Sequence, residues 1–214
     1  MDLPGASARF VASMSYCDDL VVVHARSGTG NRGYRTEETS IDRAIVVLAI
    51  AAWQVAIENL VLTGLDLAVA ASSHIPGANM NALKGTVDNA VKRFSTANST
   101  NSRTLLLNVG FDPSSTWSSF TMPGPTSGRS ASDQLDDWLK LRHAIAHGNS
   151  PLPGVQALQH VRQQTAGGGP VPVDPRLRLV DAKSCMKFVR RLTKVTADAF
   201  ADHLGISRVA WTRS

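Results

Sequence analysis

The sequence predicts an all-α protein: an up-and-down bundle of four to five main helices, with extra short helices and one long loop rich in proline and glycine. Apolar residues recur with the spacing of one helical face over 7–26, 41–67, 79–94, 133–147 and 181–204. No stretch carries a convincing strand pattern. The 214 residues, 43% of them apolar, suffice for one well-buried domain, which we expect to cover 1–214.

Charge and cysteine content restrict the partners and the compartment. The net charge of +5 and the pI of about 9.6 favour polyanionic partners only mildly, because the basic residues are spread along the chain. A solvated basic surface explains them as well. Cys17 and Cys185 lie far apart in apolar helical contexts, which predicts buried thiols in a reducing cytoplasm. The opening M-D-L-P-G lacks the features of a signal peptide, so we expect none.

The first half of the chain is predicted to hold the central helix. A glycine-rich run at 28–33 follows the first helix; no strand precedes it and it lacks a Gly-Lys-Ser/Thr ending, so we expect a flexible connector. Thr39 or Ser40 can cap the next helix, 41–67, which carries Glu58 in an otherwise apolar run. That unbroken run is shorter than the roughly 20 residues that span a bilayer, so we expect a buried helix and no membrane partner.

Two further segments complete the middle of the chain. A short helix is predicted at 102–109, after the helix over 79–94. The segment 111–129 is rich in proline, glycine, serine and threonine, so we expect a surface excursion with Trp117 and Phe120 as its anchors.

The last third is predicted to alternate helix and loop. Ser132 or Asp133 can cap the helix over 133–147, and Gly148 can end it. We expect 149–174 to be a long irregular loop with a helical turn at 155–164, and 176–180 to be briefly extended. Asp181 can cap the final helix, and Gly205 can end it.

The helix over 133–147 carries a charge on its packing face. Five apolar residues share one stripe at about 100° per residue: Leu135, Trp138, Leu139, Ile145 and Ala146. Arg142 falls within that stripe, with His143 and His147 on its flank. A guanidinium on a packing face is costly unless a partner or a ligand meets it. We therefore expect Glu58 to orient Arg142 directly or through water; Glu58 on a solvated strip is the alternative.

A metal site is the first chemistry to weigh for this helix. His143 and His147 are spaced to clamp a metal, but the zinc-peptidase pattern needs Glu where this chain has Ala144, and no third ligand stands out. Acyl transfer has no support either, because no nucleophile elbow and no neighbouring Cys–His pair occur. We expect neither a metal nor a cofactor.

Arginine and histidine together suit the cleavage of RNA. Histidine can take or give a proton near neutral pH, and arginine presents fixed donors to phosphate oxygens. A base would remove the 2′-hydroxyl proton, that oxygen would attack the phosphorus, and an acid would protonate the departing 5′-oxygen. Residues five apart on a helix are turned by about 140°. One copy supplies a single strong acid–base residue, so we expect a two-fold homodimer with a composite site.

The run L-R-H-A-I-A-H-G at 141–148 resembles the motif of HEPN domains, in which Arg precedes His by four to six residues and a polar residue follows the Arg. Further segments resemble the RiboL-PSP-HEPN branch over most of the chain: the apolar helix with Trp53 and Glu58, the run K-R-F-S-T-A-N-S-T-N-S-R-T-L-L-L-N-V-G-F followed by Trp117, and the final long helix. The resemblance implies a HEPN-like bundle and a metal-independent endoribonuclease in a toxin or antiviral-defence role, with an antitoxin or a defence-system protein as a further partner.

Carried over by position, the resemblance implies a role for each motif residue. Arg142 would hold the phosphate, His147 would be the acid–base residue and His143 the polar auxiliary. Glu58 and Asn149 are expected to support the site. Asn149 stands where one subclass has a tyrosine that antitoxins nucleotidylate, so that form of regulation is not implied.

Two other interpretations stay open. The first is a catalytically inactive HEPN module that binds RNA, a nucleotide or a partner protein; such members commonly lack the Arg or the His, and both are present here. The second is a structural role, in which Arg142 and the histidines only pair with Glu58 and loop carbonyls.

Overall fold

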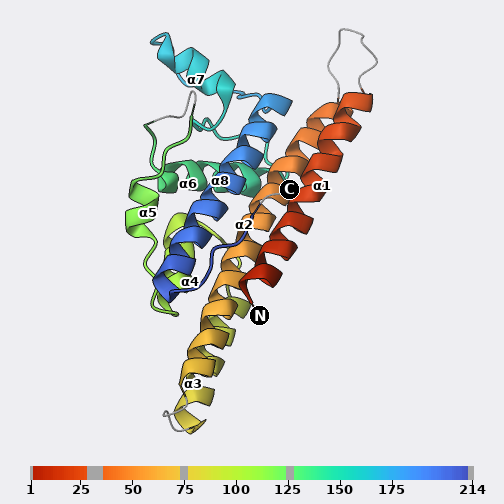
Figure 1. The fold of residues 1–214 in the computed structure, drawn as a ribbon. Coiled ribbons are helices and arrows are strands. Elements are labelled where there is room, and N and C mark those ends of the chain that lie inside the picture. Colours follow the sequence, from red (N-terminus) through yellow and green to blue (C-terminus); the bar gives the residue numbers. More distant parts are fainter. Residues whose placement is uncertain (1, 28–35, 73–76, 124–127, 212–214) are drawn as a thin grey trace.

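A computed structural model describes residues 2–27, 36–72, 77–123 and 128–211. The described residues form helices and loops without a strand (Figure 1), which confirms the all-α class. The eight helices are α1 (Leu3–Ser27), α2 (Thr36–Ala71), α3 (Gly77–Lys92), α4 (Ser99–Leu107), α5 (Ser114–Ser118), α6 (Ala131–Ala146), α7 (Gln159–Ala166) and α8 (Leu179–Leu204). The glycine-rich run at 28–33 lies outside the described residues.

Helix α2 is the centre of the bundle, as the sequence predicts. It contacts α1, α3, α4, α6 and α8. Figure 1 shows α1 side by side with it and α8 beside its middle. The predicted start is wrong: α2 begins at Thr36, so Thr39 and Ser40 lie inside the helix and not at its N-cap.

Helix α2 is longer than the apolar run from which the sequence analysis judged it too short to cross a membrane. Among the described helices, only α2 is long and apolar enough to cross a membrane by length and composition. The expectation that its apolar stretch is too short for a bilayer therefore does not hold. The same helix has 61% of its apolar window buried inside the protein, as in the core helix of a bundle.

The starts of several helices differ from the predicted starts, because hydrogen bonds to capping residues fix where each helix begins. The side chain of Asp2 accepts a hydrogen bond from the Gly5 N–H (2.9 Å), so α1 starts before residue 7. Asn98 caps α4 by accepting from the Asn101 N–H (2.7 Å), so the helix begins at Ser99, three residues before the predicted start. In α8 the cap is Arg178, whose N–H donates to the Asp181 carboxylate (3.0 Å); Asp181 is not itself the cap.

The long loops hold more structure than expected. The segment predicted as a surface excursion contains α5, and both predicted anchors, Trp117 and Phe120, are buried. The helical turn predicted at 155–164 corresponds to α7, which begins only at Gln159. Arg178 is extended, as predicted for 176–180, but Leu179 and Val180 already belong to α8. Gly205 ends α8 with φ 66°, as predicted. Cys17 and Cys185 are buried free thiols.

At Gly64 the helix α2 packs closely against Phe200 of α8 and Val109 after α4. A Cβ atom at this position would lie 2.9 Å from the Phe200 ring and 3.2 Å from Val109. Phe200 is fully buried, so its ring has no room to retreat. Gly64→Ala should therefore lower the free energy of unfolding by about 1–3 kcal/mol, measured by urea denaturation.

Gly85 supplies the matched control. It lies in α3, and a Cβ atom there meets nothing within 4 Å. Gly85→Ala should stabilise the protein by about 0.5–1 kcal/mol, because alanine restricts the unfolded chain. Equal effects of the two substitutions would contradict the packing assigned to Gly64.

Candidate functional site

Helix α6 begins at a serine cap that the sequence analysis missed. Ser130 accepts a hydrogen bond from the Asp133 N–H (3.0 Å) and donates its hydroxyl to the Asp133 carboxylate (2.8 Å). The predicted caps, Ser132 and Asp133, are wrong because the helix already runs from Ala131. The reciprocal pair fixes the start of the helix and thereby the register of the residues further along.

The end of α6 is fixed by a glycine turn. Gly148 has φ 67°, and its N–H donates to the Ile145 carbonyl (3.1 Å). The Asn149 N–H reaches back to the Ala144 carbonyl (2.9 Å), which completes a Schellman motif. His147 is therefore the C-cap residue and not the last helical residue.

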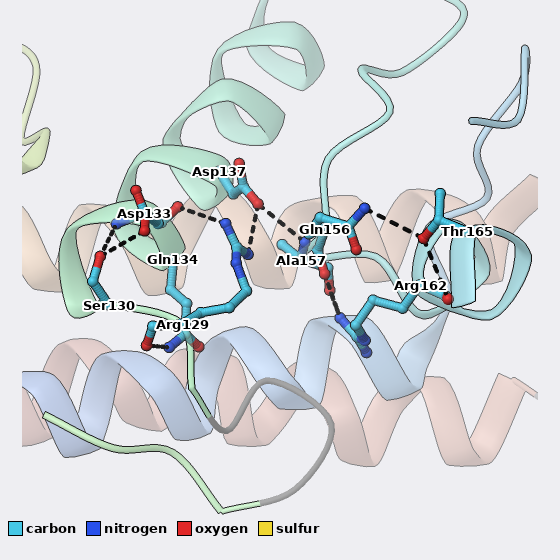
Figure 2. A network of polar contacts seen from close by, with 9 residues as sticks. All are labelled: Arg129, Ser130, Asp133, Gln134, Asp137, Gln156, Ala157, Arg162 and Thr165. Atoms are coloured by element: carbon cyan, nitrogen blue, oxygen red, sulfur yellow. Dashed lines mark hydrogen bonds and ion pairs between the residues drawn. The ribbon is translucent and has the colours of Figure 1, made fainter. Parts of the chain in front are cut away.

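The acidic residues of α6 are all engaged in holding the fold. Figure 2 shows the Asp137 carboxylate accepting from Arg129 (2.8 Å) and from the Ala157 N–H (3.2 Å), which ties the helix to the segment before α7. On the other side, Asp136 accepts from the N–H (2.9 Å) and the hydroxyl (3.0 Å) of Ser99 at the start of α4. With Asp133 in the cap, no acid of α6 is left over to neutralise the bases of the second half.

The two histidines lie together at the exposed end of α6. The ring centroids of His143 and His147 are 4.4 Å apart at an interplanar angle of 54°. Both residues are exposed, and in the described chain neither side chain makes a hydrogen bond or an ion pair. A single copy therefore presents two adjacent imidazoles to solvent.

Arg142 lies where the apolar stripe of α6 runs out. Leu135 and Trp138 are buried, whereas Ile145 is half-buried and Ala146 is exposed. Arg142 is half-buried, so its stem packs while its guanidinium can reach solvent. The described residues provide no hydrogen bond and no ion pair to that guanidinium.

Glu58 does not serve as the direct partner of Arg142. Its carboxylate accepts from the Gln54 amide (2.9 Å), and Gln54 also donates to the Phe94 carbonyl (2.8 Å). Burial raises the pKa of Glu58, and the hydrogen bond from Gln54 partly opposes that rise. No ion pair between Glu58 and Arg142 occurs in the described chain. Gln54 thus links Glu58 to Phe94, just after the end of α3. The predicted direct contact between Glu58 and Arg142 is wrong.

A pocket of about 570 Å³ adjoins the end of α6. It brings together His143 and Asn149, two of the predicted site residues, but its lining does not include Arg142 or His147. The sequence analysis missed Asp136 and Lys140, which also line it. Their spacing with the histidines, at 136, 140, 143 and 147, is that of one helical face, and this pattern was the available signal.

The described residues place no further metal-ligating groups of these types with the two histidines. Within the described chain, no cluster of three or more His, Cys, Asp or Glu residues is arranged to hold a metal ion. His143 and His147 therefore form a pair to which the described residues add no third ligand of these types.

A second polar pocket, of about 670 Å³, lies where α1 ends and α2 and α8 begin, and no sequence pattern predicted it. The imidazole of His24 lies 3.5 Å from the carboxylate of Asp42, which is buried. Burial raises the pKa of Asp42 to about 6; the charge of His24 opposes the rise, and those of Glu38 and Asp181 add to it.

This pocket makes stability depend on pH. The Asp42 pKa is higher in the folded chain than its ordinary value of 3.8, so the folded state binds the proton more tightly. The stabilisation from protonation is complete below pH 3.8 and is lost as pH rises through 6. Asp42→Asn removes this loss, so it should stabilise the protein by about 2 kcal/mol more at pH 8 than at pH 4.

Urea unfolding at the two pH values tests this prediction. Asp174→Asn is the control, because Asp174 is an exposed residue of the same pocket. It should change stability little at either pH. A gain from Asp42→Asn that is the same at pH 4 and pH 8 would show that the Asp42 charge is not costly in the fold.

Comparison with known proteins gives no assignment: no family model matches the chain, and no curated protein or solved structure is similar enough to count as a match.

Proposed function

We propose that this protein is a metal-independent endoribonuclease of the HEPN type, which cleaves RNA by attack of the 2′-hydroxyl on the adjacent phosphorus. Arg142 holds the phosphate, His147 transfers the proton and His143 assists. The active species is a homodimer with a composite site. The proposal also includes a cytoplasmic location and a toxin or antiviral-defence role, with an antitoxin or a defence-system protein as partner.

One observation carries the proposal. At the end of α6, the side chains of Arg142, His143 and His147 have no hydrogen bond or ion pair in the described chain. The carboxylates of Asp133, Asp136 and Asp137 in the same helix are all engaged. The half-buried Arg142, whose guanidinium can reach solvent, presents fixed donors that match phosphate oxygens, and the exposed His143 and His147 follow it by one and five residues.

The chemistry assigns a separate role to each group. The guanidinium donates to the phosphoryl oxygens, where negative charge builds up as the 2′-oxygen attacks. An imidazole accepts the 2′-hydroxyl proton, and a protonated imidazole donates to the departing 5′-oxygen. DNA lacks the 2′-hydroxyl, so the same groups leave it intact.

The contact between the two rings supports a dimer. The attacking and departing oxygens lie on opposite sides of the phosphorus in an in-line displacement. The imidazoles of His143 and His147 are 4.4 Å apart, so they approach a bound phosphate from one side. A second copy facing the first across a two-fold axis supplies a histidine on the other side.

An RNA cleavage assay with and without EDTA tests the proposal. We expect purified protein to cleave single-stranded and structured RNA, equally in both conditions, and to leave DNA of the same sequence intact. RNA that is bound but stays intact in every reaction would favour the alternative, an inactive HEPN module that binds RNA, a nucleotide or a partner protein. Cleavage that EDTA abolishes would contradict the metal-independent mechanism.

A further inference from the structure

The pocket beside the histidines lies between three segments of the chain. One wall is the outer face of α6, the second is the turn before α4 at residues 96–98, and the third is the segment 149–153 after the glycine turn. Its volume of about 570 Å³ exceeds that of a nucleobase and suits a whole nucleoside, because ligand pockets commonly measure about 300–1,000 Å³.

The lining of this pocket is apolar in part. Leu139 and Ala144 supply the side of α6, and Pro151 and Pro153 supply the side of the loop. An apolar lining of this kind favours a nucleobase, because the base gains by leaving water when it lies against apolar surface.

The pocket also offers fixed polar groups. The carboxylate oxygens of Asp136 are held by the N–H and the hydroxyl of Ser99, one bond to each oxygen, so each keeps a free acceptor site. Asn98 uses its amide oxygen to cap α4, which leaves its NH2 group as a donor. The side-chain amide of Asn149 makes no hydrogen bond in the described chain.

The pocket is joined to the proposed catalytic groups. His143 lines it and is in ring contact with His147, and Lys140 stands one turn away on the same face of α6. Lys140 is exposed and makes no ion pair in the described chain, so its ammonium group can meet a phosphate. A nucleoside in the pocket therefore places its sugar–phosphate link beside the imidazoles.

We infer that this pocket binds one nucleoside of the RNA next to the cleaved link, and that it prefers bases with an exocyclic amino group over uracil. The acceptor for that amino group is Asp136, as carboxylates accept from the amino group of cytosine. Asn149 supplies the complementary donor and acceptor. This inference deepens the proposed function and rests on it for its role in cleavage.

Binding of nucleoside monophosphates to the full chain tests the pocket without requiring cleavage. AMP, CMP, GMP and UMP are titrated into isotope-labelled protein, and amide shifts are followed at Thr96, Leu139 and Ala144. We expect AMP, CMP and GMP to shift these signals and UMP to bind at least about five-fold more weakly. Absence of shifts with all four nucleotides, or equally tight binding of UMP, would overturn the inference.

A pair of variants locates the contact. Asn149→Ala removes a side chain that supports nothing else in the described fold, and it should weaken AMP binding about five-fold or more. Asn89→Ala changes an exposed asparagine of α3 outside the pocket and should bind AMP as the wild type does. Unchanged binding in Asn149→Ala would contradict the assignment.

Cleavage mapping separates this inference from the proposed function. Sequencing of cleaved RNA ends should show a preference against uridine on one side of the cut, and Asp136→Asn, which replaces one acceptor oxygen by an amino donor, should reduce it. If RNA is cut with the same preference in both proteins, the pocket assignment fails and the ribonuclease proposal stands. If no RNA is cut but the nucleotides bind as expected, the proposed function fails and the nucleoside site stands.

Discussion

Arg142→Ala and His147→Ala are each expected to lower the rate of RNA cleavage by about 100-fold to 10,000-fold. In the proposed mechanism the Arg142 guanidinium meets the charge on the phosphoryl oxygens, and loss of such a donor commonly costs about 100-fold to 1,000-fold. Loss of a proton-transfer group costs about 100-fold to 10,000-fold. Single-turnover cleavage of a labelled RNA measures both effects.

Both variants should keep the fold, because neither side chain makes a hydrogen bond or an ion pair in the described chain. Their unfolding midpoints should lie close to the wild-type value. Arg191→Ala and His203→Ala are the matched controls: each removes an exposed residue of the same type from α8, remote in sequence from the motif. These should cleave as the wild type does. Full activity in Arg142→Ala or His147→Ala would rule out the assigned roles.

Trp53→Ala has the largest expected effect on stability. Trp53 is fully buried in α2, and its ring centroid lies 6.1 Å from that of Trp117. Its Nε1 donates to the Ala97 carbonyl (3.1 Å), directly before the cap of α4. Truncation removes the ring and leaves a cavity, so the free energy of unfolding should fall by about 3–5 kcal/mol. Urea denaturation followed by circular dichroism measures the change.

Trp53→Phe separates the ring from its hydrogen bond. Phenylalanine keeps most of the packing but leaves the Ala97 carbonyl without this donor, so the loss should be about 1–2 kcal/mol. Because Ala97 lies between Thr96 and Asn98, which line the nucleoside pocket, Trp53→Phe should also weaken nucleotide binding. If Trp53→Ala cost no more than Trp53→Phe, the ring would not be the packing centre assigned here.

The sequence predicted helices and core well where periodicity alone decides them. The central position of α2, the anchors Trp117 and Phe120, and the glycine stop of α8 all follow from local pattern and are confirmed. The starts of helices were predicted poorly, because several residues compete to cap each one. In α6 the capping residue is Ser130 and not Ser132, because the Ser130 hydroxyl both accepts from the Asp133 N–H and donates to the Asp133 carboxylate.

Only those parts of the candidate site that lie close together in the sequence could be predicted. The spacing of His143 and His147 anticipates two rings on one side of α6, and the structure places them in contact. The partner of Glu58 was predicted wrongly. A charged partner on another helix was expected, whereas the Glu58 carboxylate accepts from Gln54, one turn before it on the same helix. The pocket depends on 96–98 and 149–153 meeting α6, and no sequence pattern relates segments so far apart.

A heterodimer with one wild-type chain and one His147→Ala chain tests the composite site most directly. The two chains are co-expressed with different affinity tags, purified through both tags in turn, and compared with each homodimer in the RNA cleavage assay. If both copies of His147 serve one shared site, the heterodimer cleaves no faster than the His147→Ala homodimer. Cleavage at about half the wild-type rate would show that each chain carries its own complete site, and would contradict the shared one.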